Sequence, residues 1–129
     1  MATPIKIPYH ISKTFVQQHR ELIFIYGKDH YGNGMFGQMW VFDKEPNCYP
    51  VFTIQRYCPS NKRYLVDNLR EHKTWIDQCV DAIPIDGRPV IVCHGIGLGC
   101  SRMQELAPRL YQYMCDRLSL IQAEVEWIQ

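Results

Sequence analysis

The residues in this sequence whose type and spacing best suit chemistry are glycines grouped in two loops. The first loop follows an apolar run and contains Gly27 and then Gly32-Asn33-Gly34-Met35-Phe36-Gly37. The second follows another apolar run and reads His94-Gly95-Ile96-Gly97-Leu98-Gly99-Cys100-Ser101. Glycine allows a positive φ angle and lets the backbone come close to a ligand. Because loops of this kind between a strand and a helix hold phosphate on backbone N–H groups, they predict one nucleotide-type ligand held from two sides.

The second loop is the more specific of the two signals. Its alternating glycines expose several consecutive N–H groups, and Ile96 and Leu98 can anchor the loop in the core. Ser101 can cap the following helix, whose dipole favours an anion. The alternative is a tight turn whose glycines serve packing alone. The first loop matches the dinucleotide fingerprint Gly-x-Gly-x-x-Gly, but residues near 57 lack the acid expected about 20 positions later. The chain has no P-loop motif.

Polar and reactive side chains flank the glycines. Asp29 can accept hydrogen bonds from an adenine amine or a ribose hydroxyl, or it can cap a turn. His30 and His94 can move protons near neutral pH, although a loop histidine more often makes a plain polar contact. Cys100 is expected near a helix start, where a thiol pKa falls, but it has no paired base. We therefore predict no catalytic residue, no metal ligand and no cofactor.

Composition narrows the function classes. The 129 residues include 14 basic and 13 acidic side chains, for a net charge of +1, which argues against a reader of the nucleic-acid backbone. Nothing indicates a membrane partner, because no apolar run approaches the ~18 residues of a membrane span and the N-terminus lacks a signal-peptide layout. Six cysteines include no Cys-x-x-Cys pair, so we expect reduced thiols in a cytoplasmic protein.

Strand and helix patterns alternate along the chain. Strands are expected at residues 22–26, 51–54 and 89–93, and helices at 35–42, 69–83 and 108–121. Less regular segments are interpreted as a loose lead-in or edge (1–8), a first strand (9–16), a polar connection (61–67), a capping box starting at Asn68, and a continuation of the last helix (123–129). This order predicts a single α/β domain with a mixed central sheet flanked by helices. Both glycine loops would lie at the carboxyl ends of strands, where such sheets bind ligands.

These motifs resemble those of macro domains. The segment from His94 to Gly99 after a strand is similar to their diphosphate-binding loop, and Tyr26-Gly27-Lys28-Asp29 with the glycines up to Gly37 looks like their first loop. Residues 22–120 more closely resemble small phage-encoded macro-like proteins, which carry Phe-Gly-Asp-Asn, a glycine pair, Pro-Asn (here Pro46-Asn47) and a late Gly-Ile-Gly-x-Gly. The chain departs from the pattern in lacking a triple glycine and in replacing Asp-Asn by Lys28-Asp29, which adds a cation for a phosphate.

The resemblance implies one macro-like domain over residues 1–129 that binds an ADP-ribose-containing, NAD-derived nucleotide. For a phage protein it implies a sponge that sequesters an immune signal in the bacterial host cytosol. Two alternatives stay open: a hydrolase of ADP-ribosyl linkages or of a signalling nucleotide, with Asp29 or His94 positioning water, and a protein-interaction inhibitor with purely structural glycine loops. A homodimer is compatible with the aromatic content. The ligand contacts implied are Gly27, Asp29, Gly32, Asn33, Gly34, Met35, Phe36, Gly37, His94, Gly95, Ile96, Gly97, Leu98, Gly99, Cys100 and Ser101.

Overall fold

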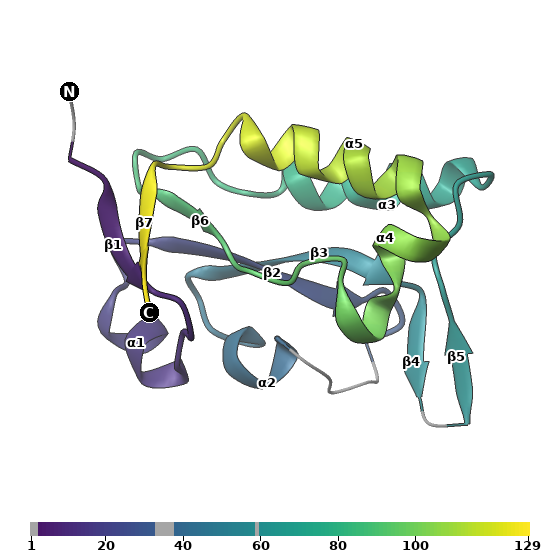
Figure 1. The fold of residues 1–129 in the computed structure, drawn as a ribbon, viewed down its shortest axis with the longest axis horizontal. Helices are drawn as coiled ribbons and strands as arrows, with labels where there is room; N and C mark the ends of the chain where they lie inside the picture. The colour runs from purple at the N-terminus through teal and green to yellow at the C-terminus, as the bar shows by residue number, and fades with distance from the viewer. Residues whose placement is uncertain (1–2, 33–37, 59) are drawn as a thin grey trace.

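The computed structural model describes residues 3–32, 38–58 and 60–129. Within these ranges three parallel strands form a central sheet in the order β3-β2-β6 (Figure 1). The strands are β2 (Ile23–Asp29), β3 (Cys48–Ile54) and β6 (Val90–Val92). Phe24 of β2 stands opposite Cys48 of β3, and Ile23 stands opposite Val90 of β6. The predicted α/β class is confirmed.

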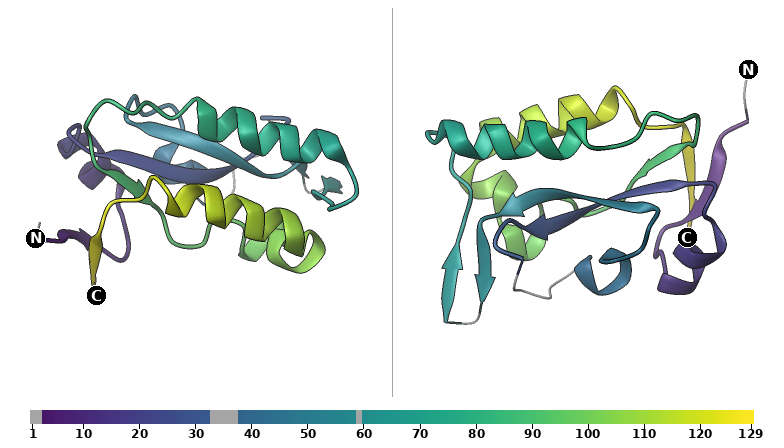
Figure 2. Two further views of the ribbon diagram at one scale, coloured as in Figure 1. Left: turned by 90° about the horizontal axis from the view of Figure 1, so that it is seen from above. Right: turned by 180° about the vertical axis from the view of Figure 1, so that it is seen from behind.

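Helices cover both faces of this sheet. They are α1 (Lys13–Gln18), α2 (Met39–Phe42), α3 (Arg70–Asp81) and α5 (Pro108–Ser119). Figure 2 shows α3 and α5 side by side on one face, and Figure 1 shows α1 and α2 on the other. Successive strand residues point to opposite faces, so Ile23 and Ile25 pack with the α3 and α5 layer while Phe24 and Tyr26 pack with the opposite cluster. The continuous apolar run of β2 follows from this double coverage.

The long helices form where apolar spacing predicts them, but one predicted cap is wrong. Helix α3 begins at Arg70, and its N-cap position is Leu69. Asn68 therefore lies one residue before the cap position and does not start a capping box. Pro108 occupies the first turn of α5 as expected. The Asp67 carboxylate caps the N-terminus of α5, where it accepts the amide N–H of Leu110 at 2.8 Å.

The two ends of the chain differ from the sequence predictions. Strand β1 (Ile5–Pro8) pairs in parallel with β7 (Val125–Ile128) in a two-stranded sheet. Of the two interpretations of residues 1–8, residues 5–8 therefore fit the edge and not the loose lead-in, and residues 123–129 do not extend the last helix. Residues 13–18 form α1 in place of a strand, because Ser12 caps a helix there by accepting the Phe15 amide at 3.1 Å. The paired ends lie beside the amino-terminal half of the sheet in Figure 1.

An antiparallel hairpin projects beyond the sheet (Figure 1). It consists of β4 (Arg56–Cys58) and β5 (Asn61–Arg63), where we expected part of a polar connection. We expected a mixed central sheet, but the described strand pairs of the central sheet are all parallel. Antiparallel pairing occurs in the separate hairpin. A short 3-10 helix, η1 (Gly99–Ser101), and α4 (Met103–Leu106) then connect β6 to α5.

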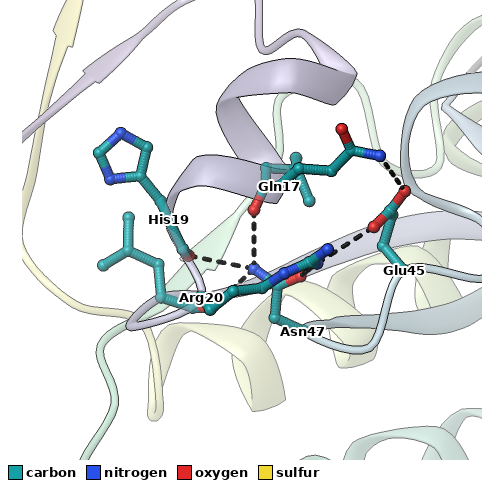
Figure 3. Close-up of polar contacts among 7 residues, drawn as sticks. Gln17, His19, Arg20, Glu45 and Asn47 are labelled. Carbon is teal, nitrogen blue, oxygen red and sulfur yellow. Dashed lines mark hydrogen bonds and ion pairs between the residues drawn. The ribbon is translucent and has the colours of Figure 1, made fainter.

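Asn47 joins α1 to the sheet (Figure 3). Its side-chain nitrogen lies 3.1 to 3.2 Å from the carbonyl oxygens of Val16, His19 and Leu22. Its amide oxygen accepts from Arg20, which also pairs with Glu45 at 3.1 Å. With 1% of its surface exposed, Asn47 is a second donor to the carbonyls of Val16 and His19, which also accept backbone amides. It also donates to the Leu22 carbonyl, so one buried amide holds the end of α1 against the start of β2. Asn47 is therefore a structural residue.

The six cysteines are free thiols. Cys79 and Cys93 are buried in the core, and Cys115 is partly buried. Burial is also the main reason that the pKa of Cys48 rises to about 12. In the described ranges, no helix combines the length and the apolar character that crossing a membrane requires.

Candidate functional site

The two glycine loops meet at the carboxyl edge of the parallel sheet, where β2 and β6 are neighbours. Gln38 joins them: its side-chain oxygen accepts the Gly27 amide at 2.7 Å, and its side-chain nitrogen donates to the carbonyl oxygen of His94. One side chain therefore sets the spacing between the end of β2 and the loop after β6. Sequence reasoning missed Gln38, because its importance depends on two backbone groups that are distant in the chain.

A cavity of about 270 Å³ lies at this meeting point. Gly27, Gln38 and Thr53 line it from one side, and Gly95 with residues 97–101 lines it from the other. The structure thus brings together the predicted Gly27 and most of the predicted second loop. Thr53 was also missed, but it is close to Gly27, where an added Cβ would lie 3.2 Å from the threonine hydroxyl.

The three glycines of the second loop all have positive φ, at +88° for Gly95, +80° for Gly97 and +61° for Gly99. Their surroundings differ. A Cβ on Gly97 would lie 2.7 Å from the ring of Tyr111, so this glycine is required for packing. A Cβ on Gly99 would have no atom within 4 Å, so the backbone there faces open space. The centre of the loop is therefore closed by packing, whereas its end at Gly99 is open to a ligand without rearrangement.

Gly99 and Cys100 present the amide groups best placed for an anion. Both residues are exposed and line the cavity. Among the described residues, no protein acceptor receives a hydrogen bond from either amide. Ser101 plays a different part from the predicted helix cap, because its buried hydroxyl donates to the Leu98 carbonyl at 3.1 Å. This bond fixes the turn that presents the two amides.

The apolar residues of the second loop divide between core and surface. Ile96 is buried and anchors the loop as predicted. Leu98 leaves 42% of its surface exposed and forms part of the cavity wall. The expectation that both residues anchor the loop is therefore wrong for Leu98, because the turn closed by Ser101 directs it outward.

A second cavity of about 400 Å³ adjoins the first and shares Gln38 and Gly95 with it. Its other lining residues are Tyr9, His10, Ile11, Val41, Phe42, Cys93 and His94. The His94 ring stacks on Tyr9 at 4.4 Å between centroids and lies 3.9 Å from the ring of Trp127. Because Tyr9 follows β1 and Trp127 belongs to β7, the paired chain ends supply aromatic surface that the sequence analysis did not place at the site.

The first loop contributes less than predicted within the described residues. Asp29 is at the end of β2 as expected, but its side chain is 0% exposed and it does not line the first cavity. A ligand would reach its carboxylate only if neighbouring groups moved. His30 stacks on Trp75 of α3 at 3.6 Å. Gly32 has a φ of +81° and open surroundings. Asn33, Gly34, Met35, Phe36 and Gly37 lie outside the described residues.

Lys28 does not provide the cation that the comparison with macro domains suggested. Its ammonium group lies 2.8 Å from the carboxylate of Asp43, which also accepts the Tyr26 hydroxyl at 2.8 Å. Burial acts to raise the pKa of Asp43, but the two hydrogen bonds outweigh it and hold that pKa below its ordinary value. The Lys28 charge is therefore neutralised inside the protein.

The fold and this site define an α/β domain with a glycine-lined cavity at the carboxyl edge of a parallel sheet. The chain belongs to a family of unknown function, DUF7831, whose sequence model matches residues 7–117. No curated protein and no solved structure matches the chain.

Proposed function

We propose that this protein is a macro-like domain that binds an ADP-ribose-containing, NAD-derived nucleotide and sequesters it without turnover. In a phage-encoded setting, the ligand would be an immune signal made by the infected bacterium. The observation that carries the proposal is the cavity between the two glycine loops, with the amides of Gly99 and Cys100 in its wall. Backbone amides bind phosphate oxygens through charge-assisted hydrogen bonds without needing a cationic side chain at the same point.

The adjoining second cavity supports a ligand that is part phosphate and part ring. It combines apolar side chains with the Tyr9 and His94 rings, on which a base can stack. The first cavity has mostly backbone and small side chains in its wall, which suits a diphosphate. A nucleotide that lies across Gln38 and Gly95, the residues common to both cavities, would place each part in matching surroundings.

The test is calorimetric titration with ADP-ribose, NAD, cyclic ADP-ribose and cyclic dinucleotides, followed by mass analysis of the ligand recovered after denaturation. Tight binding with intact ligand is expected. An altered ligand would replace sequestration by the hydrolase alternative. No heat with any of these nucleotides would refute the proposal and leave the protein-interaction alternative.

A matched pair of variants tests the location. Gly99→Ala puts a methyl group into the open space beside the two amides, and we expect it to weaken binding by about ten-fold or more. Gly87→Ala is the control, because Gly87 also has a positive φ, at +94°, and open surroundings, but it lies in a turn before β6. Equal binding by both variants would place the ligand elsewhere.

A further inference from the structure

The β4–β5 hairpin has a concentration of positive charge that the protein does not neutralise. Residues 55–64 contain Arg56, Lys62 and Arg63 and no carboxylate. Ion pairs among the described residues engage Arg20, Arg88, Arg102 and Arg117, but none engages these three cations. Arg56 and Arg63 are directly opposite each other across the strands, an arrangement of like charges that destabilises an antiparallel pair. An anion bound nearby would remove this repulsion.

The register divides the hairpin into two faces that make different contacts. Tyr57 and Lys62 are cross-strand partners on one face, and Arg56 and Arg63 share the other. Arg102, directly after η1, lies 5.4 Å from the ring centroid of Tyr64, directly after β5, so the hairpin lies against the end of the second glycine loop. Interaction with Cys100 is also the main cause that raises the pKa of Tyr57, which places the first face beside Cys100. On the other face, the Arg56 guanidinium lies 4.3 Å from the ring centroid of Tyr31, which directly precedes Gly32.

Lys62 is linked to the glycine-lined cavity through a chain of contacts. Its ammonium group lies 5.1 Å from the Tyr57 ring centroid, Tyr57 contacts Cys100, and Cys100 lines the cavity. Lys62 is exposed, so its flexible stem can move the ammonium group without disturbing the core. In contrast to Lys28, its charge is held by an aromatic face and not by a carboxylate.

We propose that the β4–β5 hairpin is the cationic wall of the ligand site, in which Lys62 contacts a phosphate of the bound nucleotide and Arg63 accelerates its approach. This inference rests on the proposed function, because it takes the cavity beside Cys100 as the phosphate position. It adds a specificity element: the site prefers ligands with a charged phosphate at the hairpin end over neutral nucleosides. A contacting charge affects dissociation, whereas a nearby charge mainly affects association.

Three charge-neutralising variants separate these roles. Lys62→Gln should weaken ADP-ribose binding by about ten-fold, mainly through faster dissociation. Arg63→Gln removes the same charge from the opposite face and should slow association by about two-fold at low salt, with dissociation unchanged. Lys73→Gln is the matched control, because Lys73 is also an exposed lysine over a tyrosine ring, 4.7 Å from the centroid of Tyr113. It should bind as the unmodified protein does.

Stopped-flow kinetics with ADP-ribose and titration with inorganic pyrophosphate decide among the outcomes. Binding of ADP-ribose that is unchanged in Lys62→Gln would overturn the hairpin inference and leave the proposed function intact. Pyrophosphate binding that Lys62→Gln weakens, without ADP-ribose binding, would support the cationic wall and refute the nucleotide proposal. Equal losses in Lys62→Gln and Lys73→Gln, or no binding of either probe, would overturn the inference.

Discussion

Replacing Gly97 by alanine tests whether the second glycine loop is fixed by packing at its centre. The new Cβ would lie 2.7 and 2.8 Å from two ring carbons of Tyr111 and 3.2 Å from the terminal methyl group of Met114. The φ of +80° adds strain of about 1–2 kcal/mol for an L-residue, and overpacking adds about 1–3 kcal/mol. We therefore expect the free energy of unfolding to fall by about 2–5 kcal/mol.

Urea unfolding of Gly97→Ala, Gly87→Ala and the double variant Gly97→Ala/Tyr111→Ala measures this effect. Gly87→Ala should show only the strain, because a Cβ there meets no atom within 4 Å. Removing the Tyr111 ring should recover part of the loss caused by Gly97→Ala, as a favourable coupling in a double-mutant cycle. If Gly97→Ala costs no more than Gly87→Ala, or if the cycle shows no coupling, the packing account of Gly97 is wrong.

Two further predictions concern buried polar groups. Asn47→Ala should lower the free energy of unfolding by about 2–4 kcal/mol in urea titration, because it removes the buried amide that donates to the carbonyls of Val16, His19 and Leu22. A loss below about 0.5 kcal/mol would contradict that role. Burial lowers the pKa of His72 below its ordinary 6.5, and Nδ1 accepts the Val66 amide at 3.0 Å only while it is unprotonated. Because the pKa of His72 is lower in the folded than in the unfolded protein, neutral His72 stabilises the fold. This stabilisation is complete above pH 6.5 and is lost as the pH falls through the folded pKa. The free energy of unfolding, measured by urea titration from about pH 7.5 downward, should fall less steeply with pH in His72→Gln than in the unmodified protein. Equal pH dependence in the two proteins would refute this role of His72.

The parts of the fold that could be predicted are those whose signal is local. Apolar residues at helical spacing, such as Ile76, Val80, Leu110 and Met114, identify α3 and α5. A continuous apolar run identifies β2. The short strands at the chain ends could not be placed in this way, because β1 and β7 are stabilised by each other across almost the whole sequence. The alternation in Val125-Glu126-Trp127-Ile128 was the available signal, and it is only four residues long.

In the candidate site, too, local features could be predicted from the sequence and features that depend on long-range contacts could not. Positive φ at Gly95, Gly97 and Gly99 is a possibility that the residue type already indicates, because glycine adopts it without penalty. The side chains that join the site, Gln38 and Thr53, have no distinctive spacing in the sequence. Their positions depend on the pairing of β2 with β3 and on where the fold brings the backbone of Gly27. Polar residues of this kind become recognisable only after the fold has brought distant backbone groups together.

The sequence analysis left two interpretations of the second loop, a phosphate cradle or a tight turn with packing glycines. The structure supports different interpretations at different glycines. Gly97 is constrained by Tyr111 and Gly99 has open surroundings, although both have positive φ and stand two residues apart. A rigid centre and an open end are compatible properties of one loop, because a packed Gly97 fixes the position from which the Gly99 and Cys100 amides project. Loss of stability in Gly97→Ala and loss of binding in Gly99→Ala should therefore separate cleanly, and this separation would show that packing and recognition are assigned to different residues.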